Sequence, residues 1–256
     1  MTFLRVDNVS MVFGGVQALD RVTMTLERGE LLGLIGPNGA GKTTFLRVLT
    51  GILRPTTGHV YFKDADITHL PTYTRAQRGI VLTHQIVRPF REMTLLENVM
   101  LAAQPALNAS PVQSLIHVDD REARARALAL LERLGIDDAA DKPAAILPLG
   151  YLKRMQVARA LAANPELLLL DEPLAGLNHT EAKRMADTIA ELNRENHTIL
   201  LVEHNLGEVT RIARRLLVLN NGAVLATGEP NEVMRRHDVR AAYLGDAAPE
   251  TEAVHA

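Results

Sequence analysis

The sequence contains no cysteine and no tryptophan, and aromatic residues make up only 4% of its 256 positions. The lack of cysteine excludes a disulfide framework and thiol chemistry. The scarcity of aromatic side chains leaves few platforms on which nucleic-acid bases could stack. The formal net charge is -2, without a long run of one sign. This balance gives no electrostatic footprint for nucleic acid, and we expect no nucleic-acid partner.

Long apolar runs are also missing. No stretch approaches the roughly 18 to 20 apolar residues that a membrane-spanning helix needs, and the first residues alternate instead of forming a signal sequence. We therefore expect a soluble protein that reaches a membrane only through a partner. The hydrophobic content of 47% is sufficient for one or two domains with a substantial core.

The strongest motif is a glycine-rich segment at residues 36–44. It lies between an apolar run at 31–35 and an amphipathic run at 45–49, and it fits the P-loop pattern G-x-x-x-x-G-K-[ST]. Glycines let such a turn wrap tightly, so that backbone N–H groups and the next helix can face a phosphate. Lys42 supplies a charge near the β- and γ-phosphates, and Thr43 a hydroxyl for Mg²⁺. The predicted nucleotide site is Gly36, Pro37, Asn38, Gly39, Ala40, Gly41, Lys42, Thr43 and Thr44.

Hydrophobic periodicity predicts the elements around this motif. Strands are expected at 2–13, 19–27, 30–35, 59–63, 79–83, 167–170 and 198–202, and a hairpin at 216–226 around Asn-Asn-Gly. Helices are expected at 43–51, 95–103, 120–134, 151–163, 180–193, 206–213 and 230–236. Strands and helices alternate on both sides of a mostly helical stretch. This order favours an α/β fold with a largely parallel sheet and a ligand at the carboxyl ends of its strands.

Polar residues follow three of the predicted apolar strands. Asp171, at a strand tip, suits an outer-sphere contact to the Mg²⁺ held by Thr43, and Glu172 suits the polarisation of a water for attack on the γ-phosphate. Gln85 follows the strand at 79–83, and His204 follows the strand at 198–202. These positions place both side chains beside the expected phosphate site.

The order of these motifs resembles the ATP-binding subunit of an ATP-binding-cassette (ABC) transporter over nearly the whole chain. The resemblance implies an α/β P-loop NTPase fold with a mixed sheet core, an N-terminal antiparallel β part and a helical subdomain. It implies a single domain over 1–256, with a catalytic core at 1–92 and 162–246, a helical subdomain at 93–161 and a flexible tail at 247–256. The implied cofactors are ATP and Mg²⁺, and the implied activity is ATP hydrolysis coupled to transport.

The resemblance also implies a role for each matching residue. Phe13 would stack on adenine, and Gln85 would contact the metal, sense the γ-phosphate and couple to the membrane partner. Glu172 would be the general base and His204 the switch histidine. Residues 175–178 would cross the interface between two subunits, which in this family close head to tail around two ATP molecules.

One segment departs from the family pattern Leu-Ser-Gly-Gly-Gln. The corresponding residues, here called the signature segment, are Leu147, Pro148, Leu149, Gly150 and Tyr151. In the family the serine hydroxyl and the glycine N–H groups bind the γ-phosphate of ATP on the opposite subunit, whereas Pro148 has neither a hydroxyl nor an N–H. A hydrogen bond lost to a charged phosphate is worth roughly 1.5–3 kcal/mol. We therefore expect a heterodimer whose other subunit carries an intact signature; a homodimer with two weakened sites and neutral drift at Pro148 are the alternatives.

Several segments that nucleotide chemistry does not explain resemble subunits that energise branched-chain amino-acid import. They are residues 13–15, 87–99, 175–178 and 239–245. We therefore expect import of hydrophobic amino acids or related amides in a bacterium. The alternatives are another transporter branch similar to lipopolysaccharide export, and a non-transport regulatory nucleotide-binding protein.

Residues 86–98 are the predicted contact with transmembrane permease subunits, through Arg88, Phe90, Arg91 and Glu92. Such a contact implies a peripheral position at the cytoplasmic face of the inner or plasma membrane. It also implies an indirect connection to a periplasmic or extracellular solute-binding protein.

Overall fold

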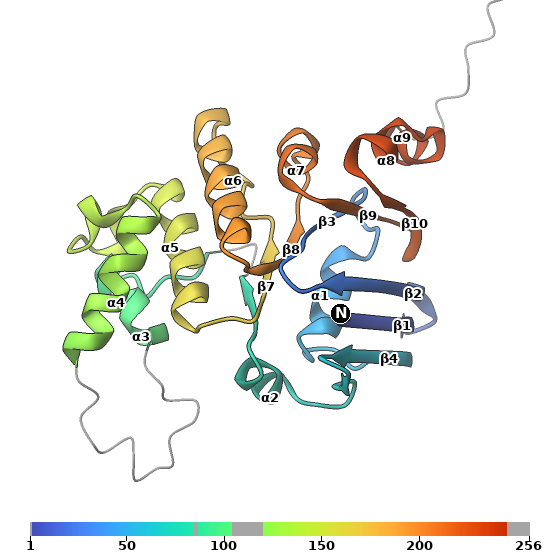
Figure 1. Cartoon of the computed structure of the whole chain (residues 1–256), viewed down its shortest axis with the longest axis horizontal. Coiled ribbons are helices and arrows are strands. Elements are labelled where there is room, and N and C mark those ends of the chain that lie inside the picture. Colours follow the sequence, from blue (N-terminus) through green and yellow to red (C-terminus); the bar gives the residue numbers. More distant parts are fainter. Residues whose placement is uncertain (1, 84–86, 104–119, 245–256) are drawn as a thin grey trace, which may run out of the picture.

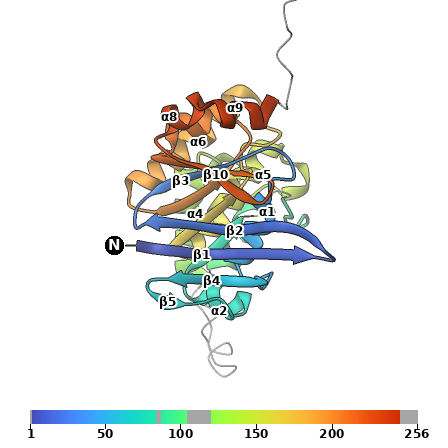
Figure 2. The same ribbon diagram turned by 90° about the vertical axis from the view of Figure 1, so that its right-hand side faces the viewer.

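The computed structural model describes residues 2–83, 87–103 and 120–244. An antiparallel sheet forms from the N-terminal third in the order β2-β1-β4-β5. Its strands are β1 (Thr2–Phe13), β2 (Val16–Glu27), β4 (Thr57–Phe62) and β5 (Ala65–Asp66). Figure 2 shows β1, β2 and β4 side by side across one end of the molecule. The expected N-terminal antiparallel part is therefore confirmed, although β2 begins three residues earlier than alternation predicts.

The central sheet has the strand order β10-β9-β3-β8-β7-β6. These strands are β3 (Leu31–Ile35), β6 (Ile80–Thr83), β7 (Leu167–Asp171), β8 (Thr198–Val202), β9 (Arg215–Asn220) and β10 (Ala223–Gly228). All neighbours are parallel except β10, which runs antiparallel to β9. Every residue of β3, β7 and β8 is buried, which explains why their sequences read as continuous apolar runs.

The turn between β9 and β10 is the Asn-Gly hairpin that the sequence predicts. Asn221 and Gly222 have φ values of 46° and 78°, as a type I′ turn requires. The N–H of Gly222 donates to the carbonyl of Ala40 at 3.1 Å. The hairpin therefore touches the P-loop.

Helices cover the central sheet and form a separate group at one end of the molecule (Figure 1). They are α1 (Lys42–Leu49), α2 (Thr72–Gln77), α3 (Leu95–Ala103), α4 (Asp120–Arg133), α5 (Leu149–Ala162), α6 (His179–Arg194), α7 (Leu206–Ile212), α8 (Pro230–Arg235) and α9 (His237–Leu244). The predicted helices do not include α9 or α2, the second of which begins without a side-chain cap. None of the helices in the described ranges has the length and hydropathy of a membrane span.

Two apolar cores lie on opposite faces of the central sheet. Along β3, Leu31 and Ile35 belong to the core beneath α5 and α6, whereas Leu32 and Leu34 belong to the core that contains α1. The alternation follows from the two-residue period of a strand. As a result of this arrangement of the two cores, α1 and the P-loop that precedes it lie between the two sheets.

A buried arginine fixes the far end of α1. Arg75 of α2 is 1% exposed, and its guanidinium donates to the carbonyls of Val48 and Leu49 at 2.7 and 2.8 Å. It also donates to Leu70 at 3.0 Å and Thr68 at 2.9 Å. Burial lowers the pKa of Arg75 to about 10, so the side chain remains a cation at neutral pH. Its charge satisfies the last carbonyls of α1 and complements the dipole at that end.

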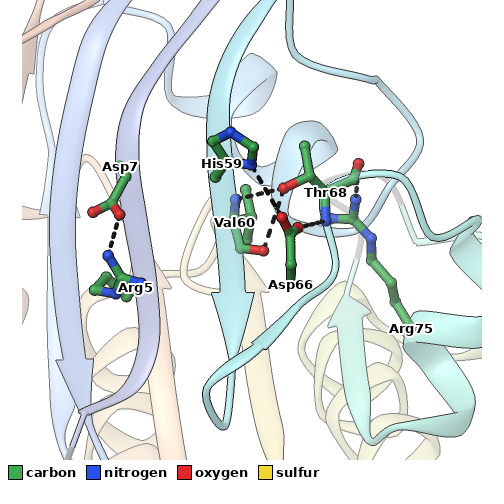
Figure 3. A network of polar contacts seen from close by, with 7 residues as sticks. All are labelled: Arg5, Asp7, His59, Val60, Asp66, Thr68 and Arg75. Atoms are coloured by element: carbon green, nitrogen blue, oxygen red, sulfur yellow. Dashed lines mark hydrogen bonds and ion pairs between the residues drawn. The ribbon is translucent and has the colours of Figure 1, made fainter.

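Figure 3 shows how this anchor continues to the sheet. The N–H of Thr68 donates to Asp66 at 2.8 Å, and its hydroxyl accepts from the N–H of Val60 at 2.9 Å. Asp66 also contacts Nδ1 of His59 at 3.0 Å. The C-terminus of α1 is thus connected through Arg75 and Thr68 to strand β4.

Candidate active site

A cleft of about 330 Å³ lies at the carboxyl edge of the central sheet. The P-loop, β2 and the segments that follow β7 and β8 meet there, as expected for an open α/β sheet. The lining residues are Ala18, Asn38, Gly39, Ala40, Gly41, Lys42, Thr43, Thr44, Glu172 and His204. The structure therefore brings together residues that are more than 160 positions apart in the sequence.

The P-loop needs glycine at two close approaches. A Cβ at Gly36 would lie 2.2 Å from the carbonyl oxygen of Leu219, and a Cβ at Gly41 would lie 2.7 Å from that of Ala18. Both glycines have positive φ values, 153° and 102°. At the start of α1 no side chain caps the helix and no acidic residue occupies its first turn. Its first N–H groups therefore remain available for an anion.

Lys42 lies inside this loop and is 6% exposed. Its Nζ donates to the carbonyls of Gly36 at 2.7 Å and Pro37 at 3.0 Å. Burial lowers the pKa of Lys42, and the negative charges of Glu172 and Asp171 oppose this effect. A buried cation held by two carbonyl groups beside free helix N–H groups forms an environment suited to phosphate.

The carboxylates lie where the strand pattern predicts. Asp171 ends β7, is 7% exposed, and donates its N–H to the hydroxyl of Thr83 at 3.3 Å. Glu172 follows with a φ of 50°, unusual for a residue with a side chain, and donates its N–H to the carbonyl of Val202 at 2.9 Å. Its Oε1 is 2.8 Å from Nε2 of His204. The predicted base and the predicted switch histidine are thus a contacting pair.

The structure does not place two of the predicted residues in the cleft. Phe13, at the end of β1, is 44% exposed and is not among the residues that line the cleft. Gln85 lies outside the described residues. Within the described ranges no group of three or more His, Cys, Asp or Glu side chains could hold a metal. A metal at this site would therefore depend on the Thr43 hydroxyl, Asp171 and the oxygens of a bound phosphate, a set that suits Mg²⁺.

Sequence reasoning missed two charged residues behind the cleft. Glu203 and Lys153 are 2% and 4% exposed. Burial raises the pKa of Glu203 to about 7, although hydrogen bonds from the backbone N–H groups of Leu174, His204 and Asn205 act in the opposite direction. A signal for Lys153 existed, because it shares one face of α5 with Val157 and Leu161 and is a charged residue on an apolar face.

The signature segment differs in character from the P-loop. Pro148 is the N-cap of α5 and provides no side-chain hydrogen bond, while the N–H groups of Tyr151 and Leu152 donate to its carbonyl. Leu149 is 43% exposed and the preceding Ile146 is 71% exposed. The segment is therefore apolar where a phosphate-binding loop would carry hydroxyls.

Neighbouring elements contact this segment on two sides. A Cβ at Gly176 would lie 2.9 Å from Cδ2 of Leu149, and a Cβ at Gly150 would lie 2.8 Å from Oε1 of Glu181. Glu181 also completes the capping box of α6 with Asn178. A carboxylate from α6 thus lies close to the first turn of α5, where a positive helix end would otherwise attract an anion.

A second hollow, also of about 330 Å³, lies between β6 and α5. It is lined by Val81, Leu82, Thr83, Arg88, Ala102, Gln156, Arg159 and Ala160. Arg159, which lines this hollow, also contacts Phe90. The Phe90 ring is 50% exposed, and the guanidinium of Arg159 lies over it, 5.4 Å from the ring centroid. The fully buried Asn98 exchanges hydrogen bonds with the backbone of Phe90, at 2.9 and 3.0 Å. The loop that contains Phe90 is therefore held by Asn98 and exposes an aromatic side chain.

Comparison with known sequences identifies close relatives. The sequence profile of the ABC transporter family matches residues 19–175. The high-affinity branched-chain amino acid transport ATP-binding protein LivG of Escherichia coli K12 is 42% identical over 250 residues, which cover 95% of this chain and 98% of LivG. The lipopolysaccharide export system ATP-binding protein LptB of Haemophilus influenzae is 33% identical over 246 residues, which cover 96% of this chain and 98% of LptB.

Solved structures agree with this result. The ADP conformation of MJ1267, an ATP-binding cassette of an ABC transporter, superposes with a TM-score of 0.85 at 34% identity, over 96% of this chain and all of MJ1267. The dimeric structure of the cassette MJ0796 with ADP and phosphate superposes with a TM-score of 0.76 at 26% identity, over 89% of this chain and 98% of MJ0796. The chain therefore belongs to the ABC transporter family, as one of its ATP-binding and ATP-hydrolysing subunits.

Proposed function

We propose that this subunit powers the import of branched-chain or other hydrophobic amino acids, or of related amides. The observation that carries the proposal is the full-length similarity to LivG, a branched-chain amino acid transport protein, at 42% identity. Similarity to the lipopolysaccharide export protein LptB has the same coverage but only 33% identity. Lipopolysaccharide export is therefore the second candidate. A regulatory protein without hydrolysis is disfavoured because both Glu172 and His204 line the cleft.

In this proposal the P-loop binds the phosphates of ATP. Residues 36–44 surround the phosphate groups, Lys42 supplies positive charge, and Phe13 stacks on the adenine at the exposed end of β1. Thr43, Asp171 and Gln85 are the residues that would hold Mg²⁺, which when bound neutralises phosphate charge. Free N–H groups at the start of α1 support this assignment.

Glu172 then acts as the general base for hydrolysis. Its carboxylate is 12% exposed, so it faces the cleft from a largely buried position, and His204 is within hydrogen-bonding distance. A carboxylate in this position can accept a proton from a water molecule that attacks the γ-phosphate in line. His204, the other member of this contacting pair, would contact the γ-phosphate.

A second ATP-binding subunit completes the site. Residues 175–178 and the signature segment would face the ATP of the partner in a head-to-tail dimer, and the dimeric structure of the cassette MJ0796 supports the formation of a dimer. Because the segment is apolar at Pro148 and Leu149, we favour a heterodimer in which another subunit supplies the intact signature. A homodimer would carry two weakened sites.

Permease subunits bind along residues 86–98. The exposed Phe90, its neighbour Arg88 and the hollow between β6 and α5 support this assignment, and Arg91 and Glu92 complete the surface. The subunit would then lie at the cytoplasmic face of the membrane and act indirectly with a solute-binding protein. We assign 1–92 and 162–246 to the catalytic core, 93–161 to the helical subdomain and 247–256 to a tail.

The test is uptake of radiolabelled leucine by cells that lack the gene for this subunit. Uptake should fall, and the wild-type chain should restore it while Glu172→Gln should not. Undiminished uptake together with reduced surface lipopolysaccharide would identify the second candidate. ATP hydrolysis by the purified subunit, measured beside Glu172→Gln and Pro148→Ser, would distinguish a homodimer from an obligate heterodimer.

A further inference from the structure

Two buried ionisable residues contact the loops that carry Glu172 and His204, and the proposed chemistry does not use them. Glu203 follows β8, and Lys153 belongs to α5. Both side chains are almost completely buried. Burying a charge is costly unless it is paired and hydrogen-bonded, so this arrangement requires a structural or functional reason.

Glu203 connects two loops through its two carboxylate oxygens. Oε1 accepts from the N–H of Leu174 at 2.6 Å, and Oε2 accepts from the N–H of His204 at 3.1 Å. Leu174 follows Glu172 by two residues, so one side chain fixes the backbone beside each member of the Glu172–His204 pair. Because burial raises the pKa of Glu203 to about 7, these hydrogen bonds become charge-assisted, and therefore stronger, as the pH rises above that value.

Lys153 fixes Glu172 from the opposite direction. Its Nζ donates to the main-chain carbonyl of Glu172 at 3.0 Å. Glu172 has the left-handed φ of 50°, a conformation that persists only when surrounding contacts hold it. Lys153 lies one turn after Leu149 on the helix that begins at the signature segment. The pair therefore connects the catalytic loops to α5.

The negative charge of Glu203 compensates the buried cation of Lys153. Burial lowers the pKa of Lys153, while the charges of Glu203, Glu172 and Asp171 oppose that effect. Glu203 is the largest of these opposing contributions. Removing Glu203 would therefore leave Lys153 as a buried charge with less compensation.

We propose that Glu203 and Lys153 are positioning residues that hold the Glu172 carboxylate beside His204 during ATP hydrolysis. The inference rests on the roles proposed above for Glu172 and His204. It adds a physical connection, within one subunit, from the helix of the signature segment to the catalytic pair. Neither residue is assigned a contact with ATP or with the attacking water.

The variants Glu203→Gln and Lys153→Met test this role in the transporter complex purified through a tag on this chain. Because small displacements of catalytic groups are costly, kcat should fall about tenfold to a hundredfold in each variant. The affinity for ATP should remain close to wild type, since the P-loop is intact. Glu208→Gln is the matched control: Glu208 is also buried, but it pairs with Arg211 on α7.

A double-mutant cycle separates positioning from simple destabilisation. If Glu203 acts through His204, adding Glu203→Gln to His204→Ala should cause little further loss of kcat. Hydrogen exchange gives a readout that does not depend on activity, because the amides of Leu174 and His204 should exchange faster in Glu203→Gln while those of β7 and β8 remain protected. Full additivity of the two losses, or unchanged exchange at both amides, would overturn the proposal.

The controls also separate this inference from the proposed function. Wild-type hydrolysis by Glu172→Gln would contradict the proposed function itself. Loss of hydrolysis in Glu172→Gln, with wild-type kcat in both Glu203→Gln and Lys153→Met, would overturn only the positioning role. Thermal melting shows whether Glu203→Gln and Lys153→Met fold. If one of them does not fold, the kcat of the other variant tests the positioning role.

Discussion

The helices α1 and α5 both begin at a segment that is proposed to face a phosphate of ATP, yet the two beginnings are built differently. The start of α1 carries a buried Lys42 between free N–H groups, and its far end is held by Arg75. The start of α5 carries Pro148 and an exposed Leu149, with the carboxylate of Glu181 close by. Neither helix has a side-chain cap, so both leave N–H groups for an anion.

In the proposed dimer, the two halves of a shared ATP site would be specified separately within one chain. The half proposed to receive this subunit's own ATP combines charge, hydroxyls and the contacting pair of Glu172 and His204. The half proposed to face the partner's ATP would offer mainly backbone groups and a helix dipole, which an adjacent carboxylate partly opposes. Four substitutions test this comparison.

Glu172→Gln should have the largest effect, because it removes the base from the complete half. General-base catalysis contributes about a hundredfold to ten-thousandfold, and we expect ATP hydrolysis to fall by about a thousandfold. ATP binding should persist, because the P-loop and Lys42 are unchanged. Steady-state hydrolysis and equilibrium binding measure the two quantities. Retained hydrolysis would mean that the half with Glu172 is not the catalytic one.

Arg75→Met should destabilise the fold by about 3 kcal/mol, because four carbonyl groups lose a buried, charged donor. The anchor of α1 would be lost while α5 is untouched. Urea denaturation measures the free energy of unfolding. Arg78→Met, at an exposed position of the same segment, is the control and should change stability by less than about 0.5 kcal/mol. Equal effects of the two variants would contradict the anchoring role of Arg75.

Pro148→Ser should raise hydrolysis about tenfold in the assembly where this segment faces ATP, because a hydroxyl bonded to a charged phosphate is worth roughly 1.5–3 kcal/mol. The two helix starts would then differ less in their capacity to bind phosphate. Pro148→Ala controls for the loss of the proline ring alone. An unchanged rate in Pro148→Ser would support neutral drift at this position.

Glu181→Gln should have the smallest effect. The amide can keep the capping hydrogen bond to the N–H of Asn178 while removing the charge near α5. A charge at a helix end is worth about 0.3–1 kcal/mol, so the apparent affinity for ATP-driven dimerisation should improve by up to about fivefold. Analytical ultracentrifugation with ATP and the Glu172→Gln background measures it. Glu191→Gln, at the exposed C-terminal part of α6, should leave the affinity unchanged.

Strong periodic or motif signals predicted most of the fold. The buried strands β3, β7 and β8 consist almost entirely of apolar residues, so their predicted bounds agree with the structure within one residue. The predicted start of α5 at Tyr151 is two residues late, because Pro148 and Leu149 do not resemble a helix start with a polar cap. Helix α2 also begins without a side-chain cap, and it is not among the predicted helices.

The site was harder to predict where long-range contacts decide it. The P-loop, Asp171 and Glu172 are adjacent in sequence to recognisable strands, but the 2.8 Å contact between Glu172 and His204 depends on strand order. Glu203 and Lys153 could not be paired from the sequence, because 50 residues and several elements separate them in the chain. Only the fold shows that they are buried behind the same pair.

The position of β3 also has a consequence for biosynthesis. Its two neighbours in the sheet, β8 and β9, begin at residues 198 and 215, whereas β3 ends at residue 35. During synthesis, most of the chain must therefore be made before β3 can pair with β8 or β9. Until then the apolar residues of β3 have neither neighbouring strand. Contacts so distant in sequence slow folding and favour aggregation of the unfinished chain. The cleft that carries Glu172 and His204 is therefore complete only after residue 204 has left the ribosome.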